Sequence, residues 1–246
     1  MKHILASGNG YDGRGDEPTE HLYIGHNNLT WFPRLPNVTH LDIGHNLIHD
    51  ISDLPFKLQW FCCADNPIED FSPIEERNLE TLWAHDTDYV PQSFSPYLTN
   101  LLLDRTPPFD YELLYGLPLQ TLELEGHDLE DLSVLEGMDL EFLNLENNKI
   151  TDISILTSMP SLKRLNIAGC PIKDKTPLNI LTMHLTKLKV CLFQINQNDT
   201  RLYGIWVEGA VIVVVIAHHI GTAGNPNTLT MMIWCGQWKE YTITLG

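Results

Sequence analysis

Apolar residues recur along this chain at a fixed spacing, and the pattern is typical of short stacked strands. The clearest copy runs from Leu140 to Leu156, with leucine or isoleucine at 140, 143, 145, 150, 153 and 156 around Asn148. Leu143 and Leu145 alternate with variable residues, which is the period of a β-strand. The segment after Ile150 is too short for a long helix, so we expect turns and 3-10 helical pieces there.

A polar or small residue follows each predicted strand, and this ladder position can be traced along the chain. Successive ladder positions lie 19 to 23 residues apart, which indicates a repeat architecture. They are Asn27, Asn46, Asn66, Thr87, Thr106, His127, Asn148, Cys170 and Phe193. An asparagine here can bond backbone groups of its own turn and of the neighbouring turn, and threonine, cysteine or histidine can supply part of that role. Phe193 cannot, so we expect the ladder to end there.

These motifs resemble the leucine-rich repeat family, in particular its short-repeat subclass seen in internalin-type proteins. The resemblance covers about residues 22–190 and implies a curved solenoid that usually recognises proteins on its concave face. The predicted fold is therefore a leucine-rich repeat solenoid of the α/β horseshoe class, mostly parallel β with turns and short 3-10 segments. Two repeats depart from the pattern, because Thr87-Asp88-Tyr89 and Thr106-Pro107-Pro108 lack the asparagine and the aliphatic residue after it.

The two ends of the chain differ from the middle. We interpret residues 1–21 as an N-terminal cap with one short strand, 22–196 as about nine repeats, and 197–246 as a small C-terminal β tail or cap. Alternation in the tail predicts strands at 202–208, 211–217, 229–235 and 238–245. The piece Trp206-Val207-Glu208-Gly209 resembles a hairpin tail of some phage proteins.

The chain is strongly acidic. Its 246 residues include 15 Lys and Arg against 32 Asp and Glu, a net charge of −17. The charges of residues 201–246 cancel, so the acidic excess lies in the first 200 residues. Such a surface disfavours direct binding to nucleic-acid phosphates or to anionic lipid. We expect a protein partner, which can be basic, and no membrane contact.

Targeting signals and disulfide patterns do not stand out. The apolar stretch near Met1 is shorter than a secretory signal needs, and the run Val211 to Ala217 is too short to span a bilayer. Five cysteines, at 62, 63, 170, 191 and 235, show no pairing logic. We predict a cytoplasmic protein with reduced thiols.

Enzyme motifs are missing from the sequence, and no catalytic residue, metal or cofactor is predicted. The string Gly8-x-Gly10-x-x-Gly13 is followed by Asp16-Glu17-Pro18 rather than by a helix, so it does not match a dinucleotide site. His45 and His49 lie on different sides of a turn and share no ligand face. Strand alternation sends Cys63 to the core and Cys62 to the open face.

The open face of the predicted sheet is the candidate binding surface. Its first zone combines aromatic and histidine side chains with a trough of small residues, Gly25, Gly44 and Ala64, that would leave space for an incoming group; its second zone is acidic. The predicted partner-binding residues are His21, Tyr23, His40, Asp42, Trp60, Trp83, His85, Asp104, Glu123, Glu125, Phe142 and Glu146.

Several interpretations of this face stay open at the level of sequence. The aromatic rings could serve as binding hot spots or could only stack on one another and stabilise the sheet. The acidic residues could steer a basic partner or simply keep the protein in solution. The leading hypothesis is a non-enzymatic module that binds a protein on its concave face. The alternatives are an acidic inhibitor that mimics nucleic acid and a metal-dependent enzyme that uses the histidines.

Overall fold

A computed structural model of the chain describes residues 3–5, 20–32, 36–178, 189–191, 201–208, 211–218, 228–234 and 238–244. It divides into two units, Met1–His127 and Asp128–Gly246. The Gly8-to-Gly13 string and Phe193, the predicted end of the ladder, lie outside the described residues. Within the described ranges, no helix is long and apolar enough to cross a membrane.

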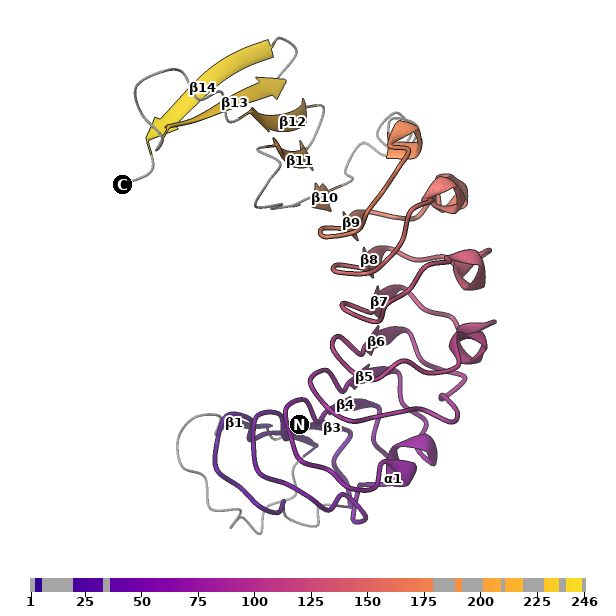
Figure 1. The fold of residues 1–246 in the computed structure, drawn as a ribbon. Coiled ribbons are helices and arrows are strands. Elements are labelled where there is room, and N and C mark those ends of the chain that lie inside the picture. Colours follow the sequence, from indigo (N-terminus) through magenta and orange to yellow (C-terminus); the bar gives the residue numbers. More distant parts are fainter. Residues whose placement is uncertain are drawn as a thin grey trace. The chain divides into compact units, whose positions relative to one another are not determined.

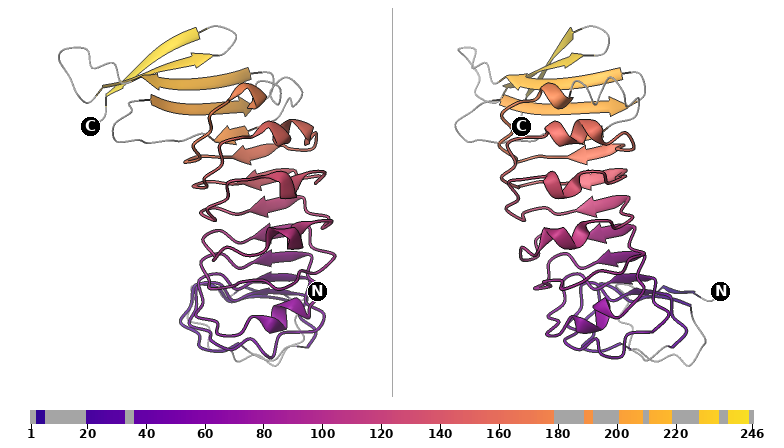
Figure 2. Two further views of the ribbon diagram at one scale, coloured as in Figure 1. Left: turned by 45° about the vertical axis from the view of Figure 1, so that its right-hand side comes forward. Right: turned by 90° about the vertical axis from the view of Figure 1, so that its right-hand side faces the viewer.

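The first unit is a stack of short parallel strands (Figures 1 and 2). The strands are β1 (His3–Leu5), β2 (His21–Tyr23), β3 (His40–Asp42), β4 (Trp60–Cys62), β5 (Thr81–Trp83), β6 (Asn100–Leu102) and β7 (Thr121–Glu123). Each pairs in parallel with the next along the chain. The return segments include the helical turns α1 (Ser72–Glu75) and η1 (Tyr111–Leu114), so the predicted parallel sheet with short outer pieces is confirmed.

The second unit continues with parallel strands and then becomes antiparallel. Strands β8 (Phe142–Asn144), β9 (Arg164–Asn166) and β10 (Lys189–Cys191) pair in parallel, with return turns η2 (Ser133–Leu135) and η3 (Ser154–Ser158). An antiparallel set follows, formed by β11 (Arg201–Glu208), β12 (Val211–His218), β13 (Thr228–Trp234) and β14 (Trp238–Thr244). These four strands lie where the alternation predicts them.

The middle residue of each strand from β2 to β9 points into the core. In the first unit these residues, Leu22, Leu41, Phe61, Leu82, Leu101 and Leu122, are at most 1% exposed. In the second unit Leu143, Leu145, Ile150 and Ile153 are fully buried, and Asn148 is 3% exposed, so the predicted register is confirmed. The first and third residues of the strands point to the opposite side, and we call the surface they form the strand face.

The two irregular repeats keep the core by using aromatic rings. Tyr89 takes the place of the missing aliphatic residue, is 1% exposed, and packs against Phe71 with ring centroids 5.0 Å apart. Phe109 is buried in the next repeat and lies 4.7 Å from the ring of Tyr111. The departures from the repeat pattern therefore change which side chain fills the core and leave the strands in register.

The ladder asparagines bond the backbone as their pattern predicts. The amide nitrogen of Asn46 donates to the carbonyls of Ile43 and Ile24, at 2.8 and 3.0 Å, and its oxygen accepts from the Leu29 N–H at 3.0 Å. Asn66 makes the same contacts one repeat later, and Asn148 donates to Leu145 and accepts from Leu129. Each such side chain ties its own turn to the preceding one, because Ile24 and Leu29 belong to the repeat before Asn46.

The other ladder residues satisfy fewer backbone groups. Thr87 and Thr106 each donate to a carbonyl three residues earlier, and the Cys170 thiol lies 3.1 Å from the Leu145 carbonyl of the preceding repeat. His127 reaches further back, with Nε2 2.7 Å from the Leu103 carbonyl. This contact requires a hydrogen on Nε2, so Nδ1 is free to accept from the Tyr111 hydroxyl at 3.2 Å. Burial lowers the pKa of His127, which favours this neutral form.

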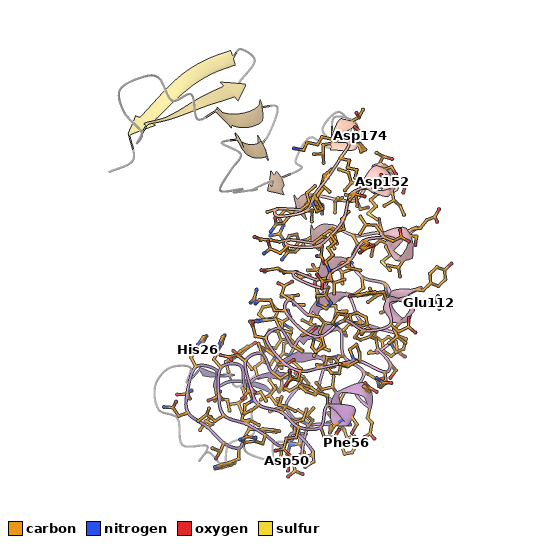
Figure 3. The ribbon with its side chains drawn as sticks, in the orientation of Figure 1. His26, Asp50, Phe56, Glu112, Asp152 and Asp174 are labelled. Atoms are coloured by element: carbon orange, nitrogen blue, oxygen red, sulfur yellow. The ribbon has the colours of Figure 1, made fainter. Side chains whose placement is uncertain are left out.

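The residue just before each ladder position adopts a left-handed backbone, a feature that the sequence patterns did not predict. In the described repeats the φ angle here lies between 51° and 74°. We call these residues the left-handed column: His26, His45, Asp65, Asp86, Arg105, Gly126, Asn147 and Gly169. All but the two glycines carry a side chain in a conformation that L residues rarely adopt. In Figure 3 His26 lies on the opposite side of the first unit from Asp50 and Phe56.

Aspartates open most of the return segments. Each accepts a hydrogen bond from the backbone N–H two residues later, at 2.8 to 3.1 Å. They are Asp50, Asp70, Asp110, Asp131, Asp152 and Asp174. Figure 3 shows Asp152 and Asp174 beside the helical turns of the second unit. This local bond turns the chain away from the ladder and into the return segment.

Candidate protein-interaction surface

The strand face of the first unit has the rows that the repeat register predicts. His21, His40 and Trp60 occupy one row, at the first position of neighbouring strands. A second row holds Tyr23, Asp42, Cys62 and Trp83 at the third position of β2 to β5. The pairing therefore brings residues more than 60 positions apart in the sequence onto one surface.

Aromatic rings pack against one another along these two rows. Trp60 lies between two partners, with its ring centroid 5.9 Å from Tyr23 and 4.9 Å from Trp83. His21 stacks on His40 at 4.0 Å, and His40 stacks towards Trp60 at 6.4 Å. We call these five residues the aromatic stripe. Cross-strand stacking thus occurs, and every ring in the stripe is still half-exposed.

The trough predicted beside the stripe is filled, and this corrects the expectation of open space there. A Cβ placed on Gly25 would lie 3.1 Å from both carboxylate oxygens of Asp42, and one on Gly44 would lie 3.1 Å from the Cys62 sulfur. The side chains of Asp42 and Cys62 therefore lie over the glycines, and they occupy the space because the glycines have no side chains. Gly25, Gly44 and Ala64 are all buried.

Cys62 is buried rather than open, which also differs from the prediction. It is 7% exposed, and Cys63 is fully buried in the core as expected. Burial and the neighbouring charge of Asp42 raise the pKa of the Cys62 thiol to about 12. The thiol is therefore protonated at neutral pH and is a poor nucleophile.

A charged edge lies next to the stripe, formed by His85 and the left-handed residues of the first unit. The rings of His26 and His45 stack at 4.1 Å, and Nδ1 of His45 lies 2.9 Å from the Asp65 carboxylate. Arg105 donates two bonds of 2.7 Å to Asp86 and a third of 2.8 Å to Glu125. These contacts join three successive repeats.

The hydrogen bonds from Arg105 are also the main reason that the pKa of Asp86 falls to about 2. His85 adds to this effect, because its Nδ1 lies 3.0 Å from the Asp86 carboxylate. The Asp86 charge is therefore held at all pH values near neutrality. Sequence reasoning placed His85 and Glu125 on the face but missed Asp86 and Arg105, because it did not anticipate the left-handed column.

The predicted acidic zone is less open than expected. Asp104 is 9% exposed and accepts a 2.6 Å bond from the Glu125 N–H, so its carboxylate faces the backbone of the next repeat instead of solvent. Glu125 is paired with Arg105, and Glu123 is half-buried on β7. In the second unit, Glu146 accepts from the Asn166 amide at 2.8 Å, and Arg164 lies 4.3 Å above the Phe142 ring.

The histidines do not gather into a metal site in the part of the chain that is described. No three His, Cys, Asp or Glu side chains converge there in a way that could hold a metal ion. Nδ1 of His49 lies 3.8 Å from Glu69, whereas His45 is bonded to Asp65. The two histidines thus have separate partners, as their positions around the turn predict.

Known proteins share this repeat sequence and architecture. A family model described as leucine-rich repeats (2 copies) matches residues 139–180. Internalin C2 from Listeria monocytogenes is 28% identical over a match that covers 63% of this chain and 72% of that chain, with a TM-score of 0.56. The chain is therefore similar to internalin-type leucine-rich repeat proteins in both sequence and fold. Repeats of this kind commonly provide extended surfaces for protein contacts.

A second solved structure resembles this chain in fold alone. The functional domain of InlJ from Listeria monocytogenes is 13% identical, with a TM-score of 0.53, and the match covers 92% of this chain and 62% of that chain. That domain includes a cysteine ladder, whereas the described ladder here contains asparagine, threonine, histidine and a cysteine. No sequence among curated proteins matches the chain significantly.

Proposed function

We propose that this chain is a non-enzymatic interaction module that binds a protein partner on the strand face of its first unit, the face predicted to be concave. The observation that carries the proposal is the pair Trp60 and Trp83, which are half-exposed on a sheet whose neighbouring strands hold them in place. Tryptophan and tyrosine dominate the binding energy of many interfaces because they bury large areas at little entropic cost.

The rigidity of the stripe supports binding as well as sheet stability. Each ring is fixed by a neighbour on another strand, so little side-chain freedom is lost when a partner covers the exposed part. The charged edge beside the stripe provides polar groups for the rim of such an interface. Asp104 faces the backbone, so we leave it out of the proposed contact surface.

The proposal is tested with a double variant, Trp60→Ala/Trp83→Ala, used beside the wild-type chain in affinity capture and then in binding measurements with the captured partner. Removing both rings should weaken binding by about 2 kcal/mol or more, which is at least thirtyfold. The matched control is Tyr97→Ala/Tyr115→Ala, which removes two rings that are 58% and 77% exposed outside the strands.

The control should keep wild-type affinity, and both double variants should show wild-type far-ultraviolet circular dichroism. Full affinity in the tryptophan double variant would place the interaction surface elsewhere in the chain. Equal loss in both double variants would show that the stripe has no special role.

A further inference from the structure

One acidic residue shares a row with two rings of the stripe. Asp42 stands between Tyr23 and Cys62 in the second row of the strand face, and Trp83 completes that row. Because Cys62 stays protonated, Asp42 carries the charge of this row from β2 to β5. A carboxylate in one row with aromatic side chains is an arrangement suited to a cation.

Trp60, in the neighbouring row, links the two rings at the ends of this row. Its ring reaches Tyr23 on one side and Trp83 on the other, at 5.9 and 4.9 Å. Asp42 and Cys62 occupy the two positions between Tyr23 and Trp83, so the Trp60 ring runs alongside them. Because Trp60 is tilted by 57° against Tyr23 and by 67° against Trp83, the faces of the three rings are turned in different directions.

The position of the carboxylate is fixed by the backbone. Asp42 Oδ1 accepts from the Gly44 N–H at 2.9 Å, and both oxygens lie over Gly25, where any side chain would displace them. An ionised carboxylate can accept about four hydrogen bonds, and Asp42 remains half-exposed. Its outer lone pairs can therefore serve a ligand while the bond to Gly44 is kept.

We propose that Asp42, Tyr23, Trp60 and Trp83 bind the positively charged side chain of an arginine or lysine from a basic segment of the partner. This inference rests on the proposed function, since it names the chemistry of the partner at the same surface. A cation over indole and phenol faces is attracted by the ring quadrupoles, and the carboxylate adds a charge-assisted hydrogen bond. The net charge of −17 would draw a basic segment towards the surface before this contact forms.

The test uses small probes of defined charge and follows the indole N–H signals of Trp60 and Trp83 by nuclear magnetic resonance. The probes are blocked tripeptides Gly-Xaa-Gly in which Xaa is arginine, lysine, citrulline or glutamate, together with spermidine. The arginine probe should bind about fivefold or more tightly than the citrulline probe, which has the same shape without the charge. Both indole signals should shift during the titration.

Two matched variants separate a local anchor from general attraction to an acidic protein. Asp42→Asn keeps an acceptor for the Gly44 N–H and should abolish the preference for arginine over citrulline. Asp88→Asn makes the same change of net charge at an exposed site outside the stripe and should keep the preference. Urea midpoints of both variants are measured beside the wild type, and Trp60→Phe provides a second variant that weakens the ring contact without emptying the site.

Equal binding of the arginine and citrulline probes would overturn the proposal, and so would equal effects of Asp42→Asn and Asp88→Asn. Spermidine that binds more tightly than every peptide would assign the site to a free polyamine and also overturn it. The proposed function is judged separately by the capture experiment. A partner that is lost with the tryptophan double variant but kept at full affinity by Asp42→Asn would retain the interaction surface and remove the cation anchor.

Discussion

The residue types in the left-handed column match the positive φ angle of the backbone there. Histidine, aspartate, asparagine and glycine fill most of the column, and these types tolerate positive φ better than other residues do. Arg105 is the exception at φ 58°, and its guanidinium is held by Asp86 and Glu125. The ion pairs offset part of the cost of the strained backbone at this position.

At the residue scale, the ladder can be tested in the second unit. Asn148→Ala should lower the free energy of unfolding by about 1–3 kcal/mol, because it strands the Leu129 N–H in a buried turn and leaves the Leu145 carbonyl with only the weak bond from the Cys170 thiol. The matched change is Asn147→Gly at the exposed position just before the ladder residue. Glycine suits the left-handed backbone of position 147. Urea denaturation should show a clearly lower midpoint for the alanine variant, and coincident midpoints would contradict the ladder role of Asn148.

The buried histidine of the ladder should make stability depend on pH. Since burial lowers the pKa of His127, the unfolded chain binds a proton at pH values where the folded chain does not, so stability falls as the pH drops below about 6.5. His127→Asn keeps a donor for the Leu103 carbonyl that does not titrate. The wild type should therefore lose more unfolding free energy than the variant between about pH 7.5 and 5.5.

The two proteins differ only at position 127, so the difference between their pH profiles reports on His127. Parallel profiles would mean that His127 contributes no pH dependence.

The return segments are held by hydrogen bonds between side chains and groups only two residues away. Asp131 accepts from the backbone N–H of Ser133 at 2.9 Å and from its hydroxyl at 2.6 Å, and these bonds lower the pKa of its carboxyl. The turn into η2 therefore depends on an ionised side chain. The same bond opens the return segments at Asp50, Asp70, Asp110, Asp152 and Asp174.

Asp131→Ala should destabilise the protein by about 0.5–1 kcal/mol through loss of these bonds. Glu130→Ala removes the same charge from the adjacent exposed position and should have a smaller effect. Because the pKa of Asp131 is lowered, its contribution is present above the ordinary carboxyl pKa and is lost as the pH falls through the folded value. The midpoints of the two variants in urea should thus differ at neutral pH and converge in acid.

The strands and the ladder could be predicted from the sequence because each repeat carries the same alternation around one position. Leu143, Leu145 and Asn148 occupy the places that this alternation assigns to them. Tyr89 could not be placed, since nothing in a repeat frame says that a phenol ring will substitute for an aliphatic side chain in the core. The direction in which a short polar side chain bends is also absent from the pattern.

This limitation explains the corrections at the candidate site. The rows of the strand face follow from the register, but Asp42 and Cys62 fold over the glycines, and Asp104 bends to the Glu125 backbone. The residue types in the left-handed column were a usable signal, since His26, Asp65, Gly126 and Asn147 all favour or tolerate positive φ. The predicted boundaries at residues 21 and 196 stay predictions, as does the cytoplasmic location.

The whole molecule carries far more negative than positive charge. With 32 acidic and 15 basic residues, repulsion between unpaired acids opposes the folded state more than the surface ion pairs support it. Sodium chloride screens both effects, and the excess of acids means that relief of repulsion dominates. Low salt is therefore the condition in which the protein should be least stable.

Raising sodium chloride from low concentration to about 0.5 M should increase the urea midpoint at neutral pH. Potassium chloride at equal ionic strength should act alike if screening is the cause. A midpoint that falls with salt would instead show that ion pairs such as those of Arg105 outweigh the repulsion.

The left-handed column has a consequence for how this scaffold could diversify. Its residues are selected by their backbone conformation, and most of them are exposed, so they make few demands on the core. In the first unit, asparagine, aspartate, histidine and glycine can therefore replace one another in the column at small cost, while each exchange changes the charge and reach of the surface beside the aromatic stripe. A library varied at these positions would sample many chemical surfaces from one foldable template.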